Sequence, residues 1–196
     1  MNSRRALVVG TAGCVFNDIA RLTLHGFTDR THDIFIVNEA FRFMARWDHW
    51  VSLHPERMVA WRSEAMHTNG RHALAPIHLP DLDPDDWDQL ASRAGGIAFP
   101  HQRHAWRVEG ATGEQSGSSG LFATRLAIRF GYERVILAGV PMDTSPHALS
   151  AEPWMDRDRF IAAWSAAERE LKGKVRSMSG WTREFLEEPT LHWWSQ

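Results

Sequence analysis

The residues best able to bind a ligand form a run of small side chains between Ser116 and Gly120. Glycine lets a ligand approach the backbone closely, and the first turn of a helix directs unpaired backbone N–H groups at an anion. The hydroxyl groups of Ser118 and Ser119 can donate to the same anion, and the alternative is that they only cap the following helix. We therefore predict a nucleotide or phosphate site at Ser118, Ser119 and Gly120.

This run opens a unit of helix, turn and buried strand. Apolar residues recur along 122–130 with the period of a helix, and Gly131 stands where a glycine often ends one. Residues 135–138 are all apolar and are followed by Gly139, which is typical of a buried strand. The unit predicts an open α/β sheet with the small-residue run at its ligand-binding edge.

Other predicted strands also end at residues that can contact a ligand. Gly10, Thr11 and Gly13 follow strand 6–9, and Asn38 follows strand 33–37. Ligands of parallel sheets bind beyond the carboxyl ends of the strands, so we expect these four residues to face the same ligand as Ser119. Two alternatives stay open: the glycines only form a tight turn, and Asn38 caps a helix that begins at Glu39.

Strands and helices alternate along the whole chain. This order predicts an α/β, Rossmann-like three-layer fold with a mainly parallel sheet, formed by residues 1–196 as a single nucleotide-binding domain. Further helices are expected at 16–24, 39–47, 58–68, 153–171 and 181–187, and further strands at 50–53, 72–78, 95–98 and 173–178. Residues 80–88 are expected to be a surface loop or the start of a helix with Asp85 and Asp86 in its first turn, and residues 100–119 a long functional loop.

Two groups of side chains are candidates for acid–base or phosphate chemistry. His147 follows the strand at 135–138 and is a candidate general base, because histidine exchanges a proton near neutral pH; an exposed loop histidine is the alternative. His101, Arg103, His104 and Arg107 form a basic cluster that predicts binding of a diphosphate or an acidic acceptor, with a solvated loop as the alternative. The eleven histidines match no metal-binding motif, so we predict no metal ligands.

Composition narrows the possible classes of protein. The 196 residues carry a net charge of -2, which argues against a global basic surface for nucleic acid. The single cysteine, Cys14, excludes an internal disulfide and suits the cytoplasm. No run is long and apolar enough to span a membrane. Ten tryptophans suggest large apolar faces, and Trp193 and Trp194 are expected to dock on the body of the chain or on a second copy in a homo-oligomer.

Three of these segments resemble one known superfamily. It contains the small bacterial sialyltransferases that use CMP-sialic acid and the 6-hydroxymethylpterin diphosphokinase-like proteins. The matching segments are the strand and glycine turn at 8–14, the strand ending in Asn at 33–38, and the unit that runs from Ser118 to Gly139. The resemblance implies a transferase that moves a glycosyl or diphosphate group from a nucleotide donor to a small-molecule or glycan acceptor. It also implies His147 as the catalytic histidine and, in the diphosphokinase branch, Asp143 as a shifted ligand for magnesium.

Several residues depart from the pattern of this superfamily. Thr11, Ala12 and Gly13 stand where its members have Asn, Gly and Pro, and Pro141 stands where many have Asp. These departures support an alternative hypothesis, a non-catalytic binding or assembly protein on a degenerate transferase fold. A third hypothesis is an enzyme that modifies nucleic-acid bases or surface sugars.

Overall fold

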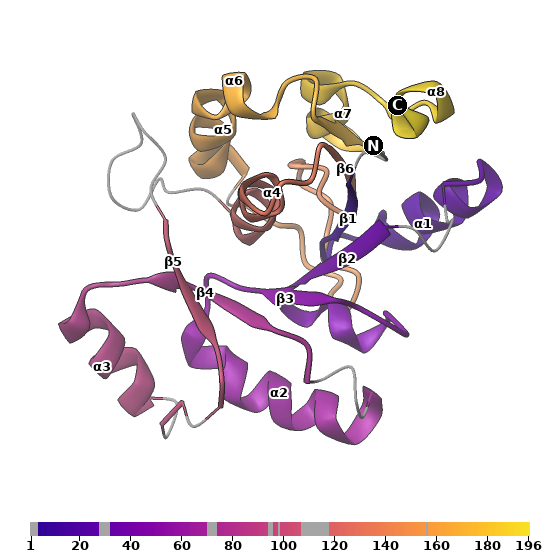
Figure 1. Cartoon of the computed structure of the whole chain (residues 1–196). Helices are drawn as coiled ribbons and strands as arrows, with labels where there is room; N and C mark the ends of the chain where they lie inside the picture. Colours follow the sequence, from indigo (N-terminus) through magenta and orange to yellow (C-terminus); the bar gives the residue numbers. More distant parts are fainter. Residues whose placement is uncertain are drawn as a thin grey trace.

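A computed structural model describes residues 4–27, 32–69, 74–93, 96–97, 99–106, 118–155 and 157–196 (Figure 1). Its centre is one seven-stranded sheet in the order β5-β4-β3-β2-β1-β6-β7, and every neighbouring pair is parallel. The strands are β1 (Arg5–Val9), β2 (His32–Val37), β3 (His49–Val51), β4 (Ile77–Asp81), β5 (Gln102–Ala105), β6 (Arg134–Ala138) and β7 (Val175–Ser177). The predicted α/β, Rossmann-like fold is confirmed.

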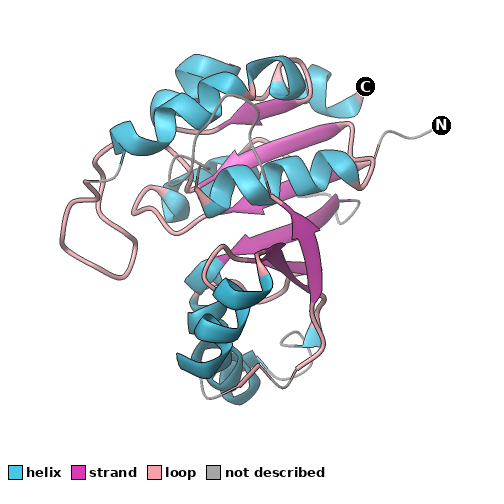
Figure 2. Ribbon diagram, turned by 90° about the vertical axis from the view of Figure 1, so that its left-hand side faces the viewer, coloured by secondary structure: helices cyan, strands magenta, loops and turns pink. Residues whose placement is uncertain are grey.

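Helices cover both faces of this sheet (Figure 2). They are α1 (Val15–Leu24), the 3-10 helix η1 (Asn38–Arg42), α2 (Pro55–Asn69), α3 (Pro84–Arg93), α4 (Ser119–Arg129), α5 (Arg157–Ala166), α6 (Glu168–Leu171), α7 (Gly180–Leu186) and α8 (Leu191–Ser195). Buried side chains of η1, α1, α2, α3 and α8 pack on one face, and those of α4, α5, α6 and α7 pack on the other. No helix in the described ranges combines the length and the apolar character that crossing a membrane requires.

The alternation of side chains along β1 shows why its sequence is continuously apolar. Ala6 and Val8 pack into the cluster under α4, whereas Leu7 and Val9 pack into the cluster under α1. Successive residues of a strand point to opposite faces, so a central parallel strand that is covered on both sides has no polar face. The chain leaves β1 in one direction toward β5 and returns to pair β6 with the other side of β1. This reversal of strand order is where a ligand-binding crevice forms in such sheets.

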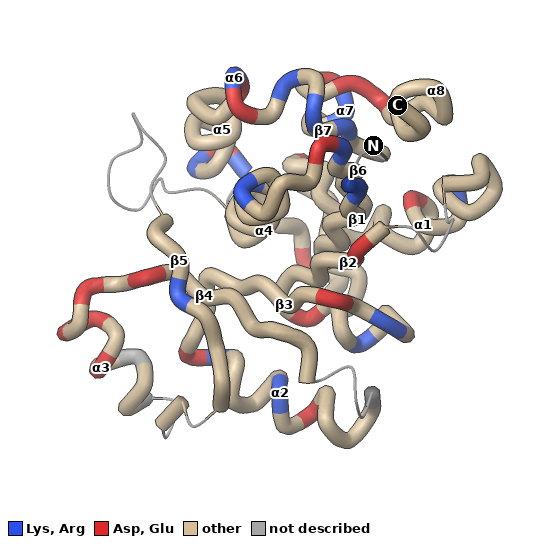
Figure 3. The backbone as a smooth tube through the Cα atoms, viewed as in Figure 1, with Lys and Arg blue, Asp and Glu red and all other residues tan. Residues whose placement is uncertain are grey.

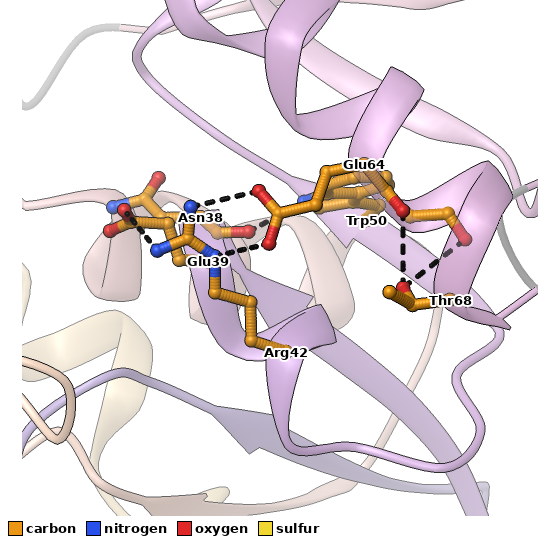
Figure 4. Close-up of polar contacts among 7 residues, drawn as sticks. Asn38, Glu39, Arg42, Trp50, Glu64 and Thr68 are labelled. Carbon is orange, nitrogen blue, oxygen red and sulfur yellow. Dashed lines mark hydrogen bonds and ion pairs between the residues drawn. The ribbon is translucent and has the colours of Figure 1, made fainter.

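Several predicted elements differ from those observed. Residues 39–47 do not form the predicted long α-helix. Asn38 has a φ of 51°, and the short η1 already ends at Arg42. The Arg42 side chain pairs with Glu39 and with Glu64 of α2 (Figure 4). The predicted long loop at 100–119 contains β5, which pairs with β4. Residues 96 and 97 lie outside any strand, β4 begins only at Ile77, and α8 was not expected.

Other expectations hold with adjusted limits. The helix predicted at 153–171 begins at Arg157 and is divided into α5 and α6. The second alternative for residues 80–88 is correct, because Asp85 and Asp86 occupy the first turn of α3, where Figure 3 shows acidic residues gathered. Within the described ranges strand β7 pairs with β6 alone, and it therefore forms the predicted edge. Trp193 and Trp194 are buried against the same chain, which decides between the two docking alternatives.

Candidate functional site

A cavity of about 460 Å³ opens at the carboxyl ends of the central strands. Its wall comes from the turns after β1, β2, β3 and β6, from the first residues of α4 and from the segment that leads into α5. The structure brings eight of the nine predicted site residues to this wall: Gly10, Thr11, Asn38, Ser118, Ser119, Gly120, Asp143 and His147. Gly13 is not part of the lining, and its N–H donates instead to the Pro146 carbonyl at 2.8 Å.

The turn after β1 lies so close to the turn after β6 that position 10 must be a glycine. Its N–H donates to the Ala138 carbonyl at 2.8 Å, and a Cβ atom at this position would lie 2.3 Å from the Gly139 carbonyl oxygen. Such a distance is far below van der Waals contact, so only glycine fits. The tight-turn interpretation of Gly10 therefore holds, and the same turn also lines the cavity.

The two serines at the start of α4 have different partners. The Ser118 hydroxyl caps the helix by accepting from the Leu121 N–H at 3.3 Å, and it also accepts from the Trp164 indole at 3.3 Å. The Ser119 hydroxyl accepts from the Leu53 N–H at 3.2 Å, so its own hydrogen remains to be donated. Ser119 is only 7% exposed, and the surface that it retains lies on the cavity. An anion at this position would meet the hydroxyl and the N-terminus of α4 together.

Asn38 does not cap η1, contrary to one of its two predicted roles. The cap position belongs to Val37 and has no side-chain hydrogen bond. The Asn38 carbonyl accepts from the Trp50 indole at 2.8 Å, a bond drawn in Figure 4, and its Oδ1 accepts from the Ser52 hydroxyl at 2.8 Å. The turn after β2 is thus tied to the end of β3, and Asn38 is one of the residues that line the cavity.

His147 reaches the cavity because the segment after β6 folds back onto the turn after β1. Ala12 and His147 form an antiparallel bridge, and the Ala148 N–H donates to the Thr11 carbonyl at 2.7 Å. The Thr11 Oγ1 lies 3.2 Å from His147 Nδ1. When Nδ1 carries the hydrogen and donates to Thr11, Nε2 is left with a free lone pair and can take a proton.

The predicted basic cluster lies elsewhere. Arg103 contacts Asp81 at 3.8 Å and stacks over the Trp87 ring, and His104 is hydrogen-bonded to His78. Neither Arg103 nor His104 lines the cavity, and Arg107 lies outside the described residues. Instead Arg159, at the start of α5, lies on the wall beside the stacked rings of Trp154 and Phe160. The sequence offered no motif for these three residues.

Magnesium is poorly matched by this wall. Among the described residues that line the cavity, Asp143 alone carries a carboxylate, and one of its oxygens already accepts from the Ser145 N–H at 2.9 Å. No group of three or more His, Cys, Asp or Glu side chains in the described part of the chain is arranged to hold a metal ion. A magnesium ion favours several oxygen ligands in octahedral geometry.

A buried carboxylate missed in the sequence supports the cavity from behind. Asp18 of α1 is fully buried, and its Oδ2 accepts from the Gly139 N–H at 2.8 Å and from the Ser179 hydroxyl at 2.7 Å. The Cys14 Sγ lies 3.2 Å from the same hydroxyl. Burial, with a smaller contribution from the charge of Asp18, raises the pKa of Cys14 to about 12, so this thiol is not an activated nucleophile.

The arrangement of the whole chain matches a solved structure, that of the sialyltransferase CstII from Campylobacter jejuni in complex with the substrate analogue CMP-3FNeuAc. The match has a TM-score of 0.59 and covers 96% of this chain and 87% of that chain. The fold is sialyltransferase-like. Sequence identity is 12%, no known family profile matches the chain, and no curated protein matches it. A sialyltransferase-like fold does not itself establish an activity, which depends on the residues of the site.

Proposed function

We propose that this chain is a single-domain transferase that moves a glycosyl group from a nucleotide-sugar donor to a hydroxyl of a small molecule or glycan. The observation that carries the proposal is the meeting of Asn38, Ser119, the N-terminus of α4 and the Thr11–His147 pair on one cavity. The neighbouring structure holds a CMP-sugar analogue, which supports a donor of that class. A cytoplasmic setting belongs to the same proposal and is supported by the lone Cys14.

The proposed reaction assigns a task to each part of the wall. His147 Nε2 removes the proton from the acceptor hydroxyl while the acceptor oxygen bonds to the anomeric carbon of the donor sugar. The bond between that carbon and the phosphate oxygen breaks, and the nucleotide leaves with the electron pair. Ser119 and the backbone N–H groups that begin α4 would stabilise the charge that develops on the departing phosphate.

Binding is tested by titration calorimetry with CMP, CDP, UDP, GDP and ATP, each with and without magnesium. We expect cytidine nucleotides to bind without a metal. Ser119→Ala should weaken CMP binding about tenfold, because a hydrogen bond to a charged group is lost, and should leave the protein folded although the Leu53 N–H loses its acceptor. Ser92→Ala, an exposed serine on α3, is the matched control. Equal affinity of the Ser119 variant would remove Ser119 from the site.

Catalysis is tested by transfer of sugar from CMP-sialic acid to a panel of glycans and small hydroxyl compounds. His147→Ala should lower kcat by a factor of about 100 or more while CMP affinity is retained, because only proton removal is lost. His25→Ala, an exposed histidine beyond α1, is the control. Retained activity would assign proton removal to another group.

Two results would redirect the assignment. Binding of ATP only with magnesium would favour diphosphate transfer, with Asp143 as the metal ligand. Binding of a nucleotide without transfer or hydrolysis would favour the non-catalytic binding protein, for which the departures at Thr11, Ala12 and Gly13 are the supporting observation.

A further inference from the structure

We propose that Ser52, a buried residue outside the cavity, is a positioning residue that determines what the site recognises. It holds the Asn38 side-chain amide with the NH2 group toward the cavity, so that this part of the wall presents hydrogen-bond donors and accepts anionic oxygens of a ligand. The inference rests on the proposed function for the identity of that ligand.

The hydrogen bonds of Ser52 determine the orientation of the amide. The Ser52 hydroxyl accepts from the His54 N–H at 2.9 Å and lies 2.8 Å from Asn38 Oδ1. A hydroxyl has a single hydrogen, and Ser52 is 0% exposed, so water cannot accept that hydrogen. Asn38 Oδ1 is the acceptor that the described residues provide for it. Turning the amide around would place two donors against each other or leave the buried hydroxyl without an acceptor, which is costly.

The backbone of Asn38 cannot move to relieve this constraint. Asn38 has a φ of 51°, and its carbonyl accepts from the indole of Trp50, which is 0% exposed (Figure 4). With the main chain held and Oδ1 occupied, the Nδ2 group is the part of the side chain left for a ligand. Asn38 lines the cavity, so a ligand can reach this group.

Ser119 likewise has its acceptor oxygen occupied by the protein and its hydrogen left for a ligand. The Leu53 N–H donates to the Ser119 hydroxyl at 3.2 Å, and this hydroxyl therefore also has its hydrogen left to donate. Two residues directly after β3 thus donate to the site: the Ser52 hydroxyl donates to Asn38 Oδ1, and the Leu53 N–H donates to the Ser119 hydroxyl oxygen. The remaining donors lie beside the N-terminus of α4, which also favours negative charge. The ligand group that fits here is a phosphate or a carboxylate.

The test compares Asn38→Asp with Asn38→Ala in titration calorimetry with CMP, cytidine and CMP-sialic acid. Aspartate keeps the acceptor for Ser52 and replaces the donor by a charged oxygen. We expect Asn38→Asp to weaken CMP binding at least tenfold and more than Asn38→Ala does, with little change for cytidine. Loss for CMP itself would assign the contact to the phosphate, whereas loss for CMP-sialic acid alone would assign it to the sugar carboxylate. Binding of both CMP and CMP-sialic acid by Asn38→Asp that equals or exceeds that of the unmodified protein would overturn the proposal.

Ser52→Ala should weaken CMP binding about fivefold although Ser52 makes no contact with the cavity, because the amide is then free to turn. Its thermal unfolding and that of Asn38→Asp are measured in parallel, so that a folding defect is recognised.

Nuclear magnetic resonance of the ligand-free protein tests the orientation without any nucleotide. We expect the Asn38 side-chain NH2 protons to exchange rapidly with water. Strong Overhauser contacts of these protons to the Ser52 Hβ atoms, with slow exchange, would refute the inference. Failure of every nucleotide to bind would instead refute the proposed function and leave this measurement valid.

Discussion

At the scale of single residues, Cys14 shows how burial can oppose a favourable position. It occupies the N-cap of α1, where the helix dipole favours a thiolate, yet burial raises its pKa to about 12. We predict that Cys14 in the folded protein reacts with a disulfide reagent at pH 8 at least about a hundredfold more slowly than in denaturant, because far less thiolate is present. Stopped-flow absorbance measures both rates. Similar rates would show that the thiolate is accessible in the folded state.

The pair of Thr11 and His147 gives a second prediction at this scale. Thr11→Val keeps the shape of the side chain and removes the oxygen that lies 3.2 Å from His147 Nδ1. We expect kcat for sugar transfer to fall about tenfold with little change in KM, since the imidazole loses the partner that selects its tautomer. Thr11→Ser should restore most of the rate. A fall in affinity for CMP with unchanged kcat would instead place Thr11 against the donor.

At the scale of elements, the turns after β1 and β6 depend on each other. Gly139 has a φ of 66°, and a Cβ atom there would lie 2.7 Å from the Val15 Cβ of α1. Gly173 has a φ of 82° with open space around it. Gly139→Ala should therefore lower the free energy of unfolding by about 2 kcal/mol more than Gly173→Ala, which carries only the backbone cost of about 1 kcal/mol. Urea unfolding measures both, and equal losses would mean that α1 moves aside without cost.

Helix α4 shows how one element serves both packing and the site. Its residues from Ser119 to Ala127 are buried except for Arg125, because the helix is covered by the sheet and by α5. Arg125 pairs with Glu170 of α6 at 2.7 Å. The first turn of α4 is therefore held from several sides, which keeps its N–H groups directed at the cavity.

At the scale of the whole molecule, a chain of histidines joins three strands. His78 Nε2 lies 3.0 Å from His49 Nδ1, and His78 Nδ1 lies 3.0 Å from His104 Nε2, with Phe130 of the α4 terminus against all three rings. Burial lowers the pKa of His78 to about 3 and also lowers the pKa values of His49 and His104. These rings are therefore neutral in the folded protein at neutral pH.

The three neutral histidines His49, His78 and His104 predict that the protein loses stability in mild acid. An unfolded histidine takes up a proton near pH 6.5, so below that pH the unfolded state binds more protons than the folded state. The free energy of unfolding should be highest above about pH 6.5 and should fall as the pH drops from there toward 3. His78→Gln should reduce the slope between pH 6.5 and 5, whereas the exposed His25→Gln should not. Urea unfolding at several pH values measures the slope, and an unchanged slope in His78→Gln would contradict the assignment.

The sequence by itself determined the class of fold and the edge of the sheet at which the cavity lies. Buried parallel strands need apolar residues on both faces, and helices need one apolar side. The alternation of strands and helices can therefore be recognised from the sequence pattern without any tertiary contact. The meeting of Gly10, Asn38 and Ser119 at one cavity then followed from parallel pairing alone.

Only the tertiary structure decided the details that give the site its polarity. Strand β5 consists of Gln102, Arg103, His104 and Ala105, which carry no pattern of a strand and are ordered by pairing with β4. Ser52 and Asp18 have roles only because their hydrogen-bond partners come from other elements. Hydrogen bonds between distant segments depend on where the fold places each donor and acceptor in space. The local pattern of apolar residues does not predict that placement.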